Sequence, residues 1–226
     1  MSNGLLRVFK TTGLALILGA SMSACALSGT VSWKEEVLLH SGHKIIVERT
    51  NKLGGYPTID SRERETTYEV VSFTVAGSNK TITWEMGFQD SRPEPNSLNL
   101  LALDVVNGIP YIAAYPAGNI AYTKWGSPNP PYIFFKYVGT KWQLIPLEEF
   151  PAAISKTNVI VGRPPAELLK PFYSVAEVEK QNYDISAKEY KTIIRTPLDH
   201  WKPRPKYLGP QAPHPIAPPN TIDGKK

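Results

Sequence analysis

A run of short alternating segments, each followed by a turn sequence, is the feature that most constrains the fold of this chain. Residues 67–76 alternate between two sets of side chains, and residues 82–86 repeat the same spacing after a short turn that contains Gly, Ser and Asn. Alternation with a period of two is typical of strands that bury one face. Asn107 and Gly108 separate two further apolar segments, and this pair suits a two-residue hairpin turn in which both positions need a positive φ.

Two more pairs of segments have the same form, residues 31–39 with 44–49 and residues 132–138 with 141–145. Four hairpins in series predict a mainly β domain, built as an antiparallel sandwich or barrel. A turn followed by a tryptophan recurs along the chain, which leaves a small propeller as an alternative. Residues 159–161 are a further candidate strand.

Helical signals occur late in the chain. Ser174 with Glu177, and Ser186 with Glu189, each have the spacing of a capping box. Two short C-terminal helices are therefore expected, over residues 175–182 and 187–195.

The basic excess of the chain lies in its C-terminal tail. Residues 197–226 contain eight prolines and carry five basic side chains against two acidic ones, so a Pro-rich disordered tail is expected. The formal net charge is +5, but residues 25–196 contain equal numbers of acidic and basic side chains. A folded part without basic excess argues against nucleic-acid binding. The tail either reaches a cell-wall polymer or an envelope protein, or is a solvated end without a function.

Cys25 is the only cysteine of the chain, and the segment before it resembles a bacterial lipoprotein signal peptide. Arg7 and Lys10 form a positive region, residues 13–20 form a short apolar core, and small residues precede Cys25. The resemblance implies that Cys25 receives a lipid, that the signal peptide is removed, and that the protein is anchored in the cell envelope. Ala26 is not the aspartate typical of inner-membrane retention, which favours the outer membrane.

Two alternatives to lipidation follow from the same segment. A transmembrane helix needs about 20 apolar residues, and the apolar core here is much shorter. Residues 24–26 also form a small-residue cleavage site, which would release a soluble protein that starts at Leu27. Met22 stands where the lipoprotein motif usually has leucine, and this departure keeps the soluble alternative open.

With Cys25 lipidated, no thiol remains for a disulfide, a cysteine metal site or a cysteine nucleophile. The expected organisation has four parts: a signal peptide (1–24), a lipidated linker (25–30), a single β-rich domain that ends in short helices (31–196) and the tail (197–226).

Common catalytic motifs do not occur in the sequence. A Gly-rich phosphate loop, HExxH, GxSxG and a calcium loop of alternating acids are all missing. His40 and His43 flank one tight turn, and because two ligands do not complete a zinc shell, we expect exposed turn residues there, with neither a metal nor a cofactor. Asp104 interrupts an apolar segment, either as a buried acid with a hydrogen-bond partner or as the polar face of an edge strand.

Aromatic residues concentrate around the proline-rich loop near residue 130. Trp125, Tyr132 and Trp142 are candidate ligand-binding residues, because an aromatic shelf beside a stiff loop can stack on a sugar ring or hold a peptide. The segment that contains Tyr132 also fits a central strand that is buried on both faces, with core packing as its role.

Three segments, residues 31–49, 98–112 and 128–151, are similar to uncharacterised bacterial lipoproteins of comparable length. The similarity implies no catalytic residue. We therefore expect a non-catalytic binding or structural module, held at the membrane by the lipid on Cys25. The alternatives are a cell-wall hydrolase that uses carboxylates such as Asp104 or Glu85 beside the aromatic cluster, and a secreted or surface-displayed recognition domain.

The lipoprotein resemblance predicts a diacylglyceryl adduct on Cys25. Mass spectrometry of the intact protein from the membrane fraction measures this adduct directly. Cys25→Ala is expected to leave the folded domain unchanged and to move the protein off the membrane. A soluble product that starts at Leu27 would contradict the prediction.

Overall fold

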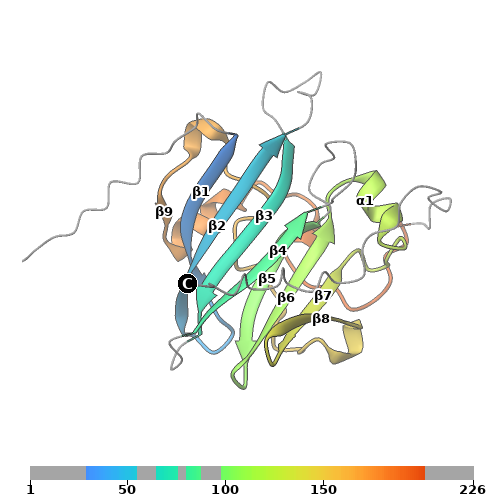
Figure 1. Ribbon diagram of the computed structural model, residues 1–226. Helices are drawn as coiled ribbons and strands as arrows, with labels where there is room; N and C mark the ends of the chain where they lie inside the picture. Colours follow the sequence, from blue (N-terminus) through green and yellow to red (C-terminus); the bar gives the residue numbers. More distant parts are fainter. Residues whose placement is uncertain (1–28, 55–64, 76–79, 88–97, 202–226) are drawn as a thin grey trace, which may run out of the picture.

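A computed structural model describes residues 29–54, 65–75, 80–87 and 98–201 (Figure 1). The expected signal peptide, Cys25 and residues 202–226 lie outside the described residues. No helix in the described part is long and apolar enough to cross a membrane.

The strands form two sheets, and each sheet is built mainly from hairpins that follow one another in the chain (Figure 1). The first sheet has the order β4-β3-β2-β1-β9, with β1 (Thr30–Leu38), β2 (Lys44–Gly54), β3 (Glu65–Thr74), β4 (Thr81–Gly87) and β9 (Phe172–Tyr173). The second has the order β5-β6-β7-β8, with β5 (Leu98–Val106), β6 (Ile109–Pro116), β7 (Ile133–Val138) and β8 (Lys141–Ile145). Every neighbouring pair is antiparallel except β1 and β9, which pair in parallel over two residues. The mainly β prediction and the serial hairpins are confirmed.

The two sheets pack against each other through one apolar cluster, as a sandwich. Val47, Phe73 and Trp84 belong to the first sheet, and Leu103 and Phe135 to the second, and all five are buried in this cluster. The rings of Trp84 and Phe135 meet edge to face, with centroids 5.7 Å apart. The period of two along each strand of the first sheet thus directs one face into the core and the other to solvent.

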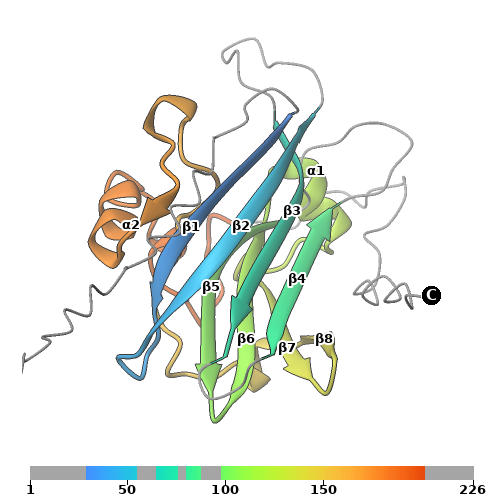
Figure 2. The ribbon, with the colours of Figure 1, turned by 60° about the vertical axis from the view of Figure 1, so that its left-hand side comes forward.

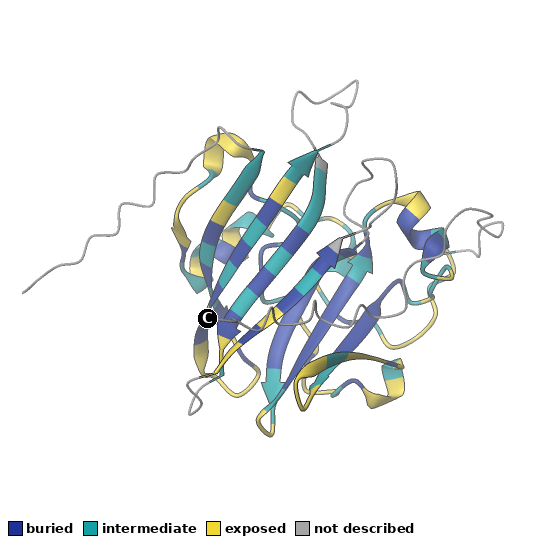
Figure 3. Cartoon of the chain, viewed as in Figure 1, coloured by how far each residue is buried: buried dark blue, intermediate teal, exposed yellow. Residues whose placement is uncertain are grey.

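Three strands of the second sheet, β5, β6 and β7, are largely buried on both faces, whereas β8 is mostly exposed. Figure 3 shows the contrast between the alternating burial of β1–β4 and the almost continuous burial of β5–β7. Phe134 of β7 packs with Phe150, Ile154 and Ile193, which come from the later part of the chain and cover the outer face of the sheet. The expectation that the segment around Tyr132 is a central strand buried on both sides is therefore confirmed.

Helix is sparse, and only part of it was predicted. α2 (Val175–Gln181) packs beside β1 (Figure 2) and begins with the expected capping box of Ser174 and Glu177. The predicted helix over residues 187–195 is wrong, because only a 3₁₀ turn forms there, at Lys188–Tyr190. The short helix α1 (Asn119–Lys124) was not predicted, since six residues are too few to show a helical period.

Long-range contacts explain the missing helix. The Glu189 carboxylate accepts hydrogen bonds from Trp201 Nε1 at 3.2 Å and pairs with His200 Nε2 at 3.1 Å, so it does not cap Ser186. The backbone N–H of Ile193 donates to Ser155 O at 3.0 Å, which holds this segment in an extended form. Residues 159–161, the further candidate strand, are not part of either sheet, and the two-residue strand β9 was missed.

The first residues of the expected tail belong to the folded body. The backbone N–H of Leu198 donates to Asn129 Oδ1 at 2.7 Å, and Asn129 Nδ2 donates to Leu198 O at 3.0 Å. The ring of Trp201 lies against that of Tyr122, with centroids 5.0 Å apart. The folded domain therefore extends beyond residue 196, the expected end, because Asn129 and Tyr122 contact residues 198–201.

We expect a side chain at Gly108, in the β5–β6 turn, to lower the stability of the protein measurably. Asn107 has φ 52° and Gly108 has φ 75°, and a Cβ at Gly108 would have no atom within 4 Å, so the cost is one of backbone conformation without a clash. We expect Gly108→Ala to lower the free energy of unfolding by about 1–2 kcal/mol. Gly108→Asn is the matched control and should lose less stability than Gly108→Ala, because asparagine tolerates positive φ. Urea denaturation of both variants measures the difference, and equal losses would contradict the prediction.

Candidate functional site

One end of the buried face of the first sheet is polar. Glu35 of β1, Arg49 of β2 and Glu69 of β3 lie on neighbouring strands and point into the interior, and their side chains are 0%, 0% and 1% exposed. Arg49 Nε donates to Glu69 Oε1 at 2.7 Å, and a second N–H of the guanidinium donates to the same oxygen. Arg49 Nη1 lies 3.4 Å from Glu35 Oε1. Three strands are thus joined through one guanidinium.

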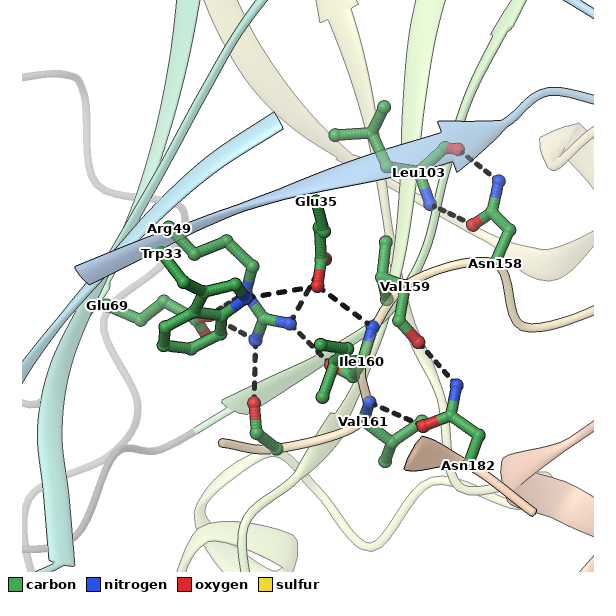
Figure 4. Close-up of polar contacts among 11 residues, drawn as sticks. Trp33, Glu35, Arg49, Glu69, Leu103, Asn158, Val159, Ile160, Val161 and Asn182 are labelled. Atoms are coloured by element: carbon green, nitrogen blue, oxygen red, sulfur yellow. Dashed lines mark hydrogen bonds and ion pairs between the residues drawn. The ribbon is translucent and has the colours of Figure 1, made fainter. Parts of the chain in front are cut away.

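A stretch of chain without regular structure, residues 158–162, lies over this polar end (Figure 4). Arg49 donates hydrogen bonds to Ile160 O and, at 2.9 Å, to Gly162 O. The backbone N–H of Ile160 donates to Glu35 Oε2 at 3.3 Å, and Trp33 Nε1 donates to the same oxygen at 3.1 Å. We call residues 158–162 the crossing segment. Its peptide groups use the hydrogen-bonding capacity of the ionic cluster, as buried polar groups require.

Two asparagines fix the crossing segment: Asn158, its first residue, bonds to β5, and Asn182 bonds to it from the end of α2. Asn158 Nδ2 donates to Leu103 O at 2.8 Å, and its Oδ1 accepts from the N–H of Leu103 at 3.1 Å. Asn182 Nδ2 donates to Val159 O at 2.7 Å, and its Oδ1 accepts from the N–H of Val161 at 3.0 Å. Each side-chain amide therefore pairs with an N–H and a C=O, as the backbone of a neighbouring strand would, and Asn158 Nδ2 donates in addition to Leu38 O at 3.0 Å. Figure 4 shows both amides in this position.

Burial controls the protonation of the ionic cluster. Burial raises the pKa of both Glu35 and Glu69, and the positive charge of Arg49 opposes this rise without cancelling it. Burial alone would lower the pKa of Arg49, but the charges of Glu69 and Glu35 outweigh that effect and raise it. Two carboxylates share one guanidinium, so the cluster is more favourable when one carboxyl group is neutral.

A cavity of about 580 Å³ lies between the β1–β2 turn, residues 153–158 and α2. Asn158 and Asn182 line it, so the amides that hold the crossing segment also form part of its wall. Its apolar lining includes Leu39, which follows β1, Ile154, and Val178 of α2. The cavity therefore has walls that the core and the crossing segment keep in place.

His40 and Asp104 form a close pair at this cavity. Asp104 is 2% exposed, and its Oδ1 lies 2.7 Å from His40 Nδ1. The backbone N–H groups of His40 and Val105 also donate to the Asp104 carboxylate, at 2.8 and 2.7 Å. A carboxylate accepts, so His40 Nδ1 carries the proton of this bond. His40 Nε2 has no hydrogen-bond partner among the described residues, and the His40 side chain is 27% exposed.

The structure decides between the two interpretations of Asp104. Asp104 lies on β5, an edge strand, but it is a buried acid with a partner and not a solvated polar residue. The expectation of an exposed turn residue is confirmed for His40, but its ring is also held by Asp104 across 64 positions of sequence, a contact that the sequence did not indicate. His43 lies on the same turn, where its Nδ1 is 3.1 Å from Ser41 Oγ.

Several other polar groups line the cavity without a hydrogen bond to the protein in the described part of the chain: the Ser155 hydroxyl, the Lys156 amine and the Glu179 carboxylate. Tyr183 also lines it and is 77% exposed. Lys191 Nζ donates to Tyr183 O at 2.8 Å and lies 5.9 Å from the centroid of the Tyr183 ring. The cavity thus offers donors, acceptors and an exposed aromatic ring together.

The three aromatic candidate residues do not share one surface. The Tyr132 hydroxyl donates to Glu189 O at 2.8 Å and accepts from the N–H of Ile194 at 3.2 Å, and the ring packs on the outer face of the second sheet. Trp125 and Trp142 pack against the cluster between the sheets, where Trp142 Nε1 donates to Thr83 O at 2.8 Å. The second sheet separates Tyr132 from the two tryptophans, so their role in ligand binding stays a prediction.

The candidate carboxylates are also separated. Glu85 lies between Trp84 and Met86 of the inner face, so its side chain is on the outer face of the first sheet, where it accepts a hydrogen bond from the Tyr68 hydroxyl. Asp104 is on the outer face of the second sheet, beyond the core. The sequence did not indicate Glu179, Lys156 or Tyr183, because only the fold places them in the same cavity as His40. The one sequence signal for this site was Asp104, the acid that interrupts an apolar segment.

No family model matches this chain, and neither a curated protein nor a solved structure matches it. Within the described ranges, no group of three or more His, Cys, Asp or Glu side chains could hold a metal ion.

The raised pKa values of Glu35 and Glu69 predict a definite pH dependence. Their contribution to stability is fully present below the pKa of an unfolded glutamate, about 4.3, and is lost as the pH rises through the raised values of the folded state. Glu69→Gln replaces the carboxyl with a group that cannot ionise. The stability of the wild type relative to Glu69→Gln should therefore fall as the pH rises from 4 to 8.

Thermal denaturation across this pH range measures that difference. Glu48→Gln is the matched control on β2, because its carboxylate is 45% exposed and pairs with Lys34 at 3.7 Å. This control should shift the melting temperature little, at any pH. A wild-type advantage over Glu69→Gln that grows with pH would show that the cluster works in the opposite direction.

Proposed function

We propose that this chain is a lipid-anchored protein of the bacterial cell envelope, and that its β domain is a non-catalytic binding module. Its ligand occupies the cavity beside His40 and Asp104. The observation that carries this proposal is the oriented imidazole of His40, whose Nδ1 is held by a buried carboxylate while its Nε2 has no partner in the described part of the chain.

The size and lining of the cavity suit a small ligand. A volume of about 580 Å³ lies within the range of small-molecule sites, about 300 to 1,000 Å³. Such sites combine an apolar lining with a few polar groups that orient the ligand. Leu39, Ile154 and Val178 provide the apolar lining. The orienting polar groups are His40, Lys156 and Glu179.

The walls of the cavity are held by hydrogen bonds within the protein. Asn158 and Asn182 each make paired bonds to backbone groups, and Asp104 holds both the ring and the backbone N–H of His40. A preformed site orders few side chains on binding, and this reduces the entropy cost of association. These bonds support a binding role.

Binding fits this geometry better than catalysis does. A carboxyl group that acts as general acid or base has to exchange a proton, and the Asp104 oxygens already accept three hydrogen bonds. A histidine that activates a nucleophile is hydrogen-bonded to it, and no hydroxyl or thiol of the described residues is bonded to His40 Nε2. The cell-wall hydrolase alternative therefore has no support in the arrangement of these groups.

The proposed lipid on Cys25 would set the position of the cavity relative to the membrane. Five positions separate Cys25 from Thr30, the first residue of β1, which is roughly 17 Å at full extension. The cavity begins at Leu38, the last residue of β1, roughly 30 Å further along the strand. The binding site would thus lie at the end of β1 remote from the anchor, where wall polymer is accessible.

The test uses a muropeptide, the disaccharide-tetrapeptide fragment of bacterial cell wall, as probe. Isothermal titration of the mature chain in detergent should give saturable binding, and His40→Ala should weaken it at least tenfold. His43→Ala is the matched control, because this imidazole lies on the same turn but does not line the cavity. No binding by the wild type, or equal affinities for the two variants, would refute the proposed site.

A further inference from the structure

Tyr183 has an unusual position for an aromatic residue of this protein. Its side chain is 77% exposed at the edge of the cavity, where it follows α2. Tyrosine is enriched at binding surfaces, because its ring is apolar and its hydroxyl is polar. The ring is large, apolar on its faces and close to the free polar groups that line the same cavity.

The backbone that carries Tyr183 is fixed. The preceding residue, Asn182, bonds to Val159 and Val161 of the crossing segment at 2.7 and 3.0 Å. Lys191 Nζ donates to Tyr183 O at 2.8 Å and lies 5.9 Å from the ring centroid. The backbone at Tyr183 is therefore held in place, and the exposed ring extends from it beside the Lys191 amine.

The charges of the lining argue for an uncharged ligand. Lys156 and Lys191 are matched by Asp104 and Glu179, so the cavity has no excess of either sign. A site that is specific for an anion would present mainly hydrogen-bond donors, and a site that is specific for a cation would present mainly acceptors. The unpartnered groups here include a donor, Lys156 Nζ, an acceptor, the Glu179 carboxylate, and a hydroxyl that can do both, that of Ser155.

From these observations we infer that the cavity is a saccharide site, an inference that rests on the proposed function. A pyranose ring has C–H groups on its faces, which pack on an aromatic ring, and hydroxyl groups around its rim, which both donate and accept. Tyr183 takes the face of the sugar, while His40 Nε2, Lys156 and Glu179 take its hydroxyl groups. The recognised part of a wall fragment is then its glycan and not its peptide.

The experiment compares two halves of the muropeptide, chitotriose as the sugar alone and the stem tetrapeptide as the peptide alone. Titration of the mature chain should show binding of chitotriose and none of the tetrapeptide. Tyr183→Ala should weaken chitotriose binding at least tenfold, whereas Tyr183→Phe should keep the affinity within twofold, because it retains the ring. The exposure of Tyr183 means that neither variant should lower the melting temperature.

Phe172→Ala is the matched control for removal of an exposed ring, since Phe172 is 42% exposed on β9 and does not line the cavity. Its affinity for chitotriose should equal that of the wild type. Binding of the tetrapeptide alone, with loss in His40→Ala, would overturn the saccharide inference and leave the proposed binding function intact. Equal losses in Tyr183→Phe and Tyr183→Ala would overturn the stacking role. Binding of neither probe nor the muropeptide would overturn both.

Discussion

The rest of the structure depends on the hydrogen bonds and ion pairs of the Arg49 guanidinium. It bonds to Glu69 of β3 and contacts Glu35 of β1, and it also holds the crossing segment through Ile160 O and Gly162 O. The ring of Trp33 lies 4.8 Å from its central carbon. Burial of such ions costs several kcal/mol each, and good geometry with further hydrogen bonds has to offset that cost. Arg49 meets this condition because peptide carbonyls complete its set of acceptors.

The crossing segment connects this ionic cluster to the proposed binding site. Its peptide groups bond to Arg49 and Glu35, its own Asn158 bonds to Leu103, and Asn182 bonds to Val159. A polar core that is fully hydrogen-bonded is rigid, because any shift leaves buried groups unpaired. The position of the cavity wall is therefore determined by charges in the interior of the first sheet. Stability and the proposed function share one set of contacts.

The extra layer on the second sheet has a similar consequence. Phe150, Ile154 and Ile193 cover the outer face of β5–β7, so the chain after β8 is part of the core. This requirement overrides local helical preference at residues 187–195, where Ile193 pairs with Ser155 and Glu189 with the ring nitrogens of His200 and Trp201. The cavity forms where this outer layer meets α2 and the β1–β2 turn. It is a product of three parts of the chain that are far apart in sequence.

The sequence by itself determined the hairpins, because a period of two and a turn such as Asn107-Gly108 depend only on residues that are close in the chain. The same holds for the start of α2 at Ser174 and Glu177. Only the tertiary structure decided which polar residues meet. Asp104 reaches His40 across 64 positions, and Arg49 reaches Ile160 across 111. Such pairs have no local signature, since burial and the packing of separate segments create the partners. That is why Asp104 was noticed from the sequence, while its partner and the cavity beside it were not.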